Sequence, residues 1–117
     1  MKRFNLICLL LFVGYQPTIF AHAVITADSL KAAPIHADQV DTISLIFNSK
    51  IELGLSQVFL VSKGDQLTPL KISQGNQQGQ MLVFIPALAN GDYALKLKVF
   101  AADGHLTEDV IHFTVVP

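Results

Sequence analysis

Cysteine and tryptophan are the residues that this 117-residue chain most lacks: it has one cysteine, Cys8, and no tryptophan. Cys8 lies in an apolar run near the N-terminus that we expect to be removed, so the mature chain would contain no cysteine. Such a chain forms no disulfide, and it offers no thiolate to a catalytic mechanism or a soft metal site. Once Met1 is lost only Met81 remains, inside a predicted strand, so a thioether site for Cu(I) is not supported either.

Basic side chains are scarce as well, with eight lysines and arginines against nine acidic residues. Two of the basic residues lie in the first three positions, so residues 22–117 carry six basic and nine acidic groups, a net charge of −3. No cluster of lysine or arginine remains in that part. Because nucleic acids and anionic membranes are bound through a concentrated basic surface, we expect neither as a partner.

Residues 1–21 are typical of a secretory signal peptide, with a basic start, an apolar run over residues 6–13 and small residues before a cut. The run is shorter than the roughly 20 residues of a membrane span, so we expect no membrane insertion of the mature chain; a retained anchor is the alternative. Cleavage after Ala21 leaves His22 as the first residue. Cleavage after Ala23 also fits the small-residue pattern, and it would discard the histidine.

Beyond residue 21, short apolar segments alternate with turn residues, and no stretch has a convincing helical stripe; residues 28–37 are ambiguous. Tyr93, Leu95, Leu97 and Val99 alternate with polar positions, as in a half-buried strand. About seven strands at this spacing predict an all-β fold, a Greek-key sandwich or barrel of the immunoglobulin-like kind, forming one domain over residues 22–117. The predicted strands cover residues 24–26, 42–47, 58–61, 70–72, 81–85, 93–99 and 111–115.

The most chemically informative residues are Asp103 and His105, which follow one of these strands. Residues two apart in an extended chain point to the same side, so a carboxylate and an imidazole would lie side by side. His22 would add two nitrogens, its ring Nδ1 and a free α-amine, whose reference pKa of about 7.7–8.0 lets a metal displace its proton near neutral pH. Three nitrogens and one oxygen form a tetragonal set that suits Cu(II), with zinc and nickel as weaker occupants.

Each half of this site also has a simpler explanation. Asp-Gly is a common turn sequence, so Asp103-Gly104 can serve only to reverse the chain. Most histidines in small proteins are surface residues, and we interpret His36 and His112 in that way. The joint occurrence of the Asp-Gly-His sequence and a histidine beside a cleavage point is what favours a metal site.

These residues resemble those of the CopC-type periplasmic copper-binding proteins, also called copper resistance proteins. The resemblance covers the mature chain, and it is most specific in Gly91-Asp92-Tyr93, Ala102-Asp103-Gly104-His105 and Phe113-Thr114-Val115. Members of that family mature to a leading histidine, typically after an alanine. We therefore place the cut after Ala21.

The resemblance implies a copper(II) site made by the amine and ring of His22 and the side chains of Asp103 and His105. It also implies a periplasmic carrier or buffer in copper homeostasis and resistance, often working beside an inner-membrane copper transporter. We expect no enzymatic activity. Two alternatives remain: a copper oxidase built on a histidine brace, and a metal-free secreted sandwich that acts in adhesion or as an accessory module.

Overall fold

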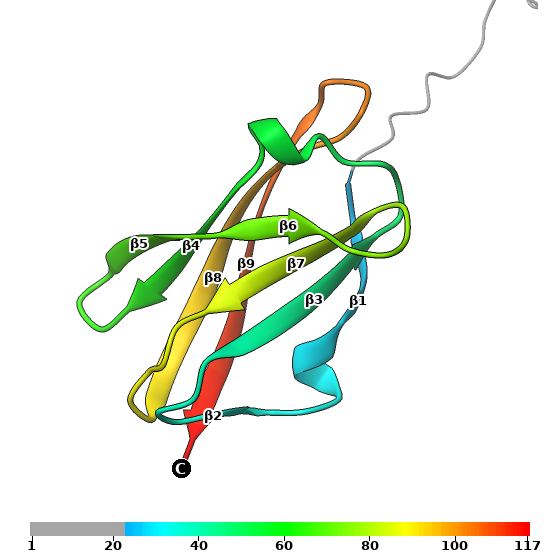
Figure 1. Ribbon diagram of the computed structural model, residues 1–117. Helices are drawn as coiled ribbons and strands as arrows, with labels where there is room; N and C mark the ends of the chain where they lie inside the picture. Colours follow the sequence, from blue (N-terminus) through cyan, green and yellow to red (C-terminus); the bar gives the residue numbers. More distant parts are fainter. Residues whose placement is uncertain (1–22) are drawn as a thin grey trace, which may run out of the picture.

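Residues 23–117, which the computed structural model describes, fold into two β-sheets packed face to face (Figure 1). The predicted all-β sandwich is confirmed, and this part of the chain forms nine strands rather than about seven. Two short 3-10 turns, η1 (Ser29–Lys31) and η2 (Leu53–Leu55), connect strands, and no helix within residues 23–117 is long and apolar enough to cross a membrane. The strands are β1 (Ile25–Asp28), β2 (Ile35–His36), β3 (Asp41–Phe47), β4 (Gln57–Ser62), β5 (Gln66–Leu70), β6 (Ile72–Gln74), β7 (Gln80–Ile85), β8 (Gly91–Phe100) and β9 (Leu106–Val116).

The two sheets have the strand orders β1-β3-β7-β6 and β2-β9-β8-β4-β5. All pairings are antiparallel except that of the two-residue β2 with β9. Every second side chain of the central strands points into the space between the sheets, and these positions are apolar. A shift of one residue in register would turn the apolar row of a strand toward water, so burial fixes the pairing. The largest of the fully buried side chains are Ile43, Leu45, Met81, Ile85, Leu95, Leu97, Val58, Val83, Val99 and Val115.

β8 and β9 form a long hairpin whose loop, residues 101–105, lies at one end of the sandwich (Figure 1). The sequence predicted a final strand only over residues 111–115, whereas β9 already begins at Leu106. The reason is Asp109, which pairs opposite the buried Leu97 but is itself exposed, so a charge interrupts the apolar alternation of β9 before Ile111. Most of β9 lies at the edge of its sheet, and a charged side chain on an edge strand discourages pairing with other chains.

One predicted strand, residues 70–72, is wrong as a single unit. Leu70 ends β5 and Ile72 begins β6, and these strands belong to different sheets, so the chain crosses between the sheets at Lys71. The apolar-polar-apolar pattern of three residues cannot reveal this crossing, because sheet membership depends on distant partners. β5 pairs with β4, and β6 pairs with β7.

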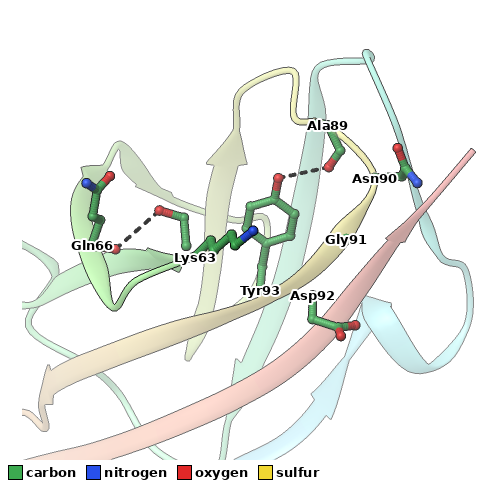
Figure 2. A pocket seen from close by; sticks show the side chains of 8 residues that line it. Lys63, Gln66, Ala89, Asn90, Gly91, Asp92 and Tyr93 are labelled. Atoms are coloured by element: carbon green, nitrogen blue, oxygen red, sulfur yellow. Dashed lines mark hydrogen bonds between the residues drawn. The ribbon is translucent and has the colours of Figure 1, made fainter.

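Tyr93 fixes the turn that leads into β8. Its hydroxyl donates a 2.8 Å hydrogen bond to the carbonyl of Ala89 (Figure 2), and its ring stacks on Phe113 with ring centroids 5.8 Å apart. A tyrosine bonded to the backbone a few residues upstream is the tyrosine corner of β-sandwiches. The residues of this turn line the hollow of about 550 Å³ that is drawn in Figure 2. It lies at the start of β8, at the opposite end of that strand from the 101–105 loop, so Tyr93 has a structural role away from that loop.

We predict that Tyr93→Phe lowers the free energy of unfolding by about 0.5–1.5 kcal/mol, the typical net contribution of one hydrogen bond. The ring stacking on Phe113 is retained in this variant, so only the bond to Ala89 is removed. Urea denaturation followed by circular dichroism measures the change. A variant as stable as the wild type would show that the corner does not stabilise the turn.

Candidate metal centre

Asp103 and His105 lie together in the loop between β8 and β9. The Asp103 carboxylate contacts His105 twice: Oδ1 accepts a 3.0 Å hydrogen bond from the main-chain N–H, and Oδ2 lies 2.9 Å from the ring Nδ1. Both side chains are partly exposed, to 36% for Asp103 and 43% for His105. The pair is thus held in a defined arrangement and remains accessible from solvent, as metal-binding groups at a surface must be.

Gly104 makes this turn possible. Its φ of +91° lies in a region that residues with a Cβ rarely adopt, and its N–H donates a 2.9 Å hydrogen bond to the carbonyl of Ala101. The sequence argument expected Asp103 and His105 on one side of an extended chain. The structure brings them together by another route, a tight turn in which the aspartate side chain bonds the residue two positions further on.

The loop is attached to residues 48–52, a segment that crosses from the end of β3 to the end of β8. Ala102 N–H donates a 3.0 Å hydrogen bond to the carbonyl of Lys50, and Ala101 pairs with Ile51 in an isolated bridge. These contacts involve the main chain immediately before Asp103. They fix the position of the Asp-Gly-His sequence relative to the crossing segment.

The start of the β1 segment is held by the same crossing segment. Val24 N–H donates a 3.0 Å hydrogen bond to Oδ1 of Asn48, and Asn48 N–H donates a 2.9 Å bond to the carbonyl of Val24. This exchange extends the β1–β3 ladder by one pair beyond Ile25 and Phe47, with a side-chain amide oxygen in the place of a main-chain carbonyl. Ala23, the residue before it, is buried at 1% exposure and belongs to the core.

The two attachments lie close together. Asn48 and Lys50 are two residues apart, so their Cα atoms are separated by at most about 7 Å. Asn48 holds Val24, and Lys50 holds the residue that precedes Asp103. The beginning of the β1 segment and the Asp-Gly-His loop therefore lie at the same end of the sandwich (Figure 1).

Two of the three ligands predicted from the sequence can be located. His22 lies outside the described residues, and within residues 23–117 no group of three histidine, cysteine, aspartate or glutamate side chains could hold a metal ion. His36 in β2 and His112 in β9 are exposed strand residues, as expected. Asp103 and His105 thus supply a carboxylate oxygen and an imidazole nitrogen, ligand types that suit copper or zinc, and further donors must come from elsewhere.

Comparison with known proteins identifies the family of this domain. The sequence model of the CopC domain matches residues 25–116, from the first residue of β1 to the last of β9. The chain belongs to the CopC family. No curated protein sequence matches this CopC domain.

Solved structures agree with this assignment. CopC from Methylosinus trichosporium OB3b is 26% identical, with a TM-score of 0.67 over 82% of this chain and 95% of that chain. PcoC, a methionine-rich copper resistance protein from Escherichia coli, is 22% identical, with a TM-score of 0.61 over 81% of this chain and 99% of that chain. At this lower identity PcoC supports the fold of the CopC domain alone.

Asn48 is a residue of this CopC domain that the sequence analysis did not identify as important. Its N–H donates one of the two hydrogen bonds that hold Val24, and its side-chain oxygen accepts the other. Asn48 therefore positions the chain just after residue 22. A lone asparagine after a predicted strand usually indicates only a turn. Its role depends on the pairing of β3 with a strand about 20 residues away, which no local pattern reveals.

We predict that Asn48→Ala loosens the start of the β1 segment without unfolding the domain. The variant loses the side-chain acceptor of Val24 N–H and keeps the main-chain bond to the carbonyl of Val24. Amide hydrogen exchange at Val24 should accelerate about 2- to 10-fold, the equivalent of one net hydrogen bond. Asn76→Ala, in the turn between β6 and β7, is the control and should leave exchange at Val24 unchanged. Equal exchange in Asn48→Ala and the wild type would contradict the role given to the amide.

Proposed function

We propose that the mature chain is a periplasmic copper(II)-binding protein that carries or buffers copper in copper homeostasis and resistance. In this proposal His22 binds the ion through its α-amine and its ring, and Asp103 and His105 bind it through their side chains. The observation that carries the proposal is that segment 48–50 holds both the chain just after residue 22 and the loop with Asp103 and His105.

The ligand chemistry supports copper(II). One carboxylate, two imidazoles and an amine form a set of nitrogen and oxygen donors, which suits the oxidised ion in tetragonal geometry. Cu(II) also binds such donors more tightly than the other divalent first-row metals. Membership of the CopC family and the likeness to the structure of CopC from Methylosinus trichosporium OB3b are consistent with a copper site.

Burial of Ala23 supports cleavage after Ala21. Ala23 is 1% exposed and packs in the core, so cleavage after Ala23 would remove a buried residue and leave its space empty. Cleavage after Ala21 keeps this contact and frees the amine of His22. A signal peptide removed at that point would deliver the domain to the periplasm, where a free amino-terminal histidine can take up copper.

We expect the protein secreted with its own leader to begin at His22. Intact-mass measurement of the protein from the periplasmic fraction distinguishes chains of residues 22–117 and 24–117. A chain that begins at Val24 would lack both nitrogens of His22, and the proposed site would then be lost.

Copper titration of the secreted protein should give one Cu(II) per chain. Replacing His22, Asp103 or His105 by alanine removes a group that binds the ion directly. Loss of a residue that only hydrogen-bonds a ligand weakens metal binding roughly 10- to 100-fold, so each of these three changes should weaken it by more than that. His112→Ala removes an exposed histidine from β9 and serves as the matched control, with unchanged affinity expected. Binding well below one ion per chain, or affinity unaffected by His22→Ala, would overturn the proposal.

A further inference from the structure

A hollow of about 250 Å³ is bordered on one side by η1 and the residues that follow it, and on the other by residues 111–114 of β9. Four of the side chains that line it are apolar and buried or half-buried: Leu30, Ile35, Ile111 and Phe113. The volume is below the roughly 300–1,000 Å³ typical of sites for small molecules. A space of this size with apolar walls suits the stem of one long side chain.

Asp28 adds a carboxylate to the lining of this hollow. Its side chain is 8% exposed, and Oδ1 accepts a 3.1 Å hydrogen bond from the main-chain N–H of Lys31. Oδ2 lies 3.9 Å from Nζ of Lys31, beyond hydrogen-bond range, and that lysine side chain is 84% exposed. A buried charge is costly unless it is closely paired, and an exposed lysine contributes little to an ion pair. The carboxylate can therefore accept a closer cation than Lys31.

The hollow also borders an open edge of the five-stranded sheet. β2 pairs only with Val115 and Val116, and the preceding residues of β9 have β8 as their only strand partner within residues 23–117. The carbonyl of Val116 accepts the N–H of Ala37, and main-chain groups alternate in direction along a strand, so those of His112 point to the same side. An extended segment of another protein can add to such an edge, with main-chain bonds for affinity and a side-chain pocket for specificity.

The charges near this edge indicate the chemistry of such a segment. Glu108 and Asp109 are exposed on the same strand, and residues 22–117 have a net charge of −3. Like charges repel across an interface, so an acidic segment is disfavoured and a basic one is favoured. Lys31 is the one basic residue that lines the hollow, and its exposed side chain can turn aside at little cost.

We propose that this hollow is a docking site for a basic extended segment of a partner protein, which pairs along the edge of β9 and inserts a lysine or arginine side chain beside η1. The stem contacts the apolar walls, and the cationic group binds Asp28 in place of Lys31. The inference does not depend on copper. Residues 111–114 lie in the half of β9 distant from the 101–105 loop, so a side chain bound here leaves the loop accessible.

The first test uses the mature, metal-free, isotope-labelled protein and a short peptide, blocked at both ends, with one lysine among alternating threonine and valine. In an NMR titration the amide signals of Leu30, His112 and Phe113 should shift, while that of Leu55 in η2 should not. A peptide with norleucine in place of lysine keeps the stem and lacks the charge. It should bind at least about 10-fold more weakly, the lower limit for loss of a hydrogen bond to a charged group.

The second test changes the protein. Asp28→Asn keeps a side chain that can cap η1 and removes the charge, so it should weaken binding of the lysine peptide at least about 10-fold and change that of the norleucine peptide little. Lys31→Gln removes the competing ammonium group and should tighten binding of the lysine peptide. Asp41→Asn is the matched control, because Asp41 also bonds a nearby main-chain N–H, and it should leave binding unchanged.

Two results would overturn the inference. One is a titration in which the signals around the hollow do not shift, or in which the lysine and norleucine peptides bind equally well. The other is a preference for lysine that persists in Asp28→Asn, because the cation would then bind at another carboxylate.

Discussion

Main-chain hydrogen bonds made by residues 48–50 determine the geometry of the candidate site. On one side Asn48 completes the β1–β3 ladder with Val24, and on the other the carbonyl of Lys50 accepts the N–H of Ala102. Val24 precedes β1, a strand of one sheet, and Ala102 follows β8, a strand of the other sheet. Residues 48–50 therefore connect the two sheets at this end of the sandwich. A metal site built from residue 22 and the 101–105 loop would need no large rearrangement of the domain. The donors of Asp103 and His105 already lie in a defined arrangement, which lowers the entropic cost of bringing them together.

The fold was predictable where apolar alternation is unbroken. The rows in β3 and β8 were recognised from the sequence because burial on one face requires a period of two, and the sandwich followed from the number of such rows. The prediction failed where a single residue departs from that rule for a non-local reason. Asp109 is an exposed charge paired opposite the buried Leu97, and Lys71 lies between two strands of different sheets. Both positions are decided by partners far along the chain, and a local pattern does not contain that information.

The candidate site was predictable in part. The closeness of Asp103 and His105 was expected from their spacing, although a glycine with positive φ, and not an extended chain, brings them together. The family resemblance pointed to His22, which lies outside the described residues. The connection between the two halves was not predictable, because it consists of bonds between main-chain atoms far apart in sequence, such as Ala102 to Lys50. Every residue except proline carries the same main-chain donor and acceptor, so a local sequence pattern does not indicate which of these groups will meet. Asn48 acquires its role only through that connection.

The proposed ligand set makes copper binding depend on proteolysis. In the precursor the nitrogen of residue 22 belongs to a peptide bond, where its lone pair is delocalised into the carbonyl and is a poor metal ligand. Of the four proposed donors, the precursor therefore offers at most three. Without a basic amine, the nitrogen and the imidazole of residue 22 do not readily close a chelate ring on one ion. Under the proposal, removal of the leader would create the missing donor next to the point where residues 48–50 hold Val24 beside Asn48. A chain with these ligands would therefore bind copper weakly before this cleavage and strongly only after it.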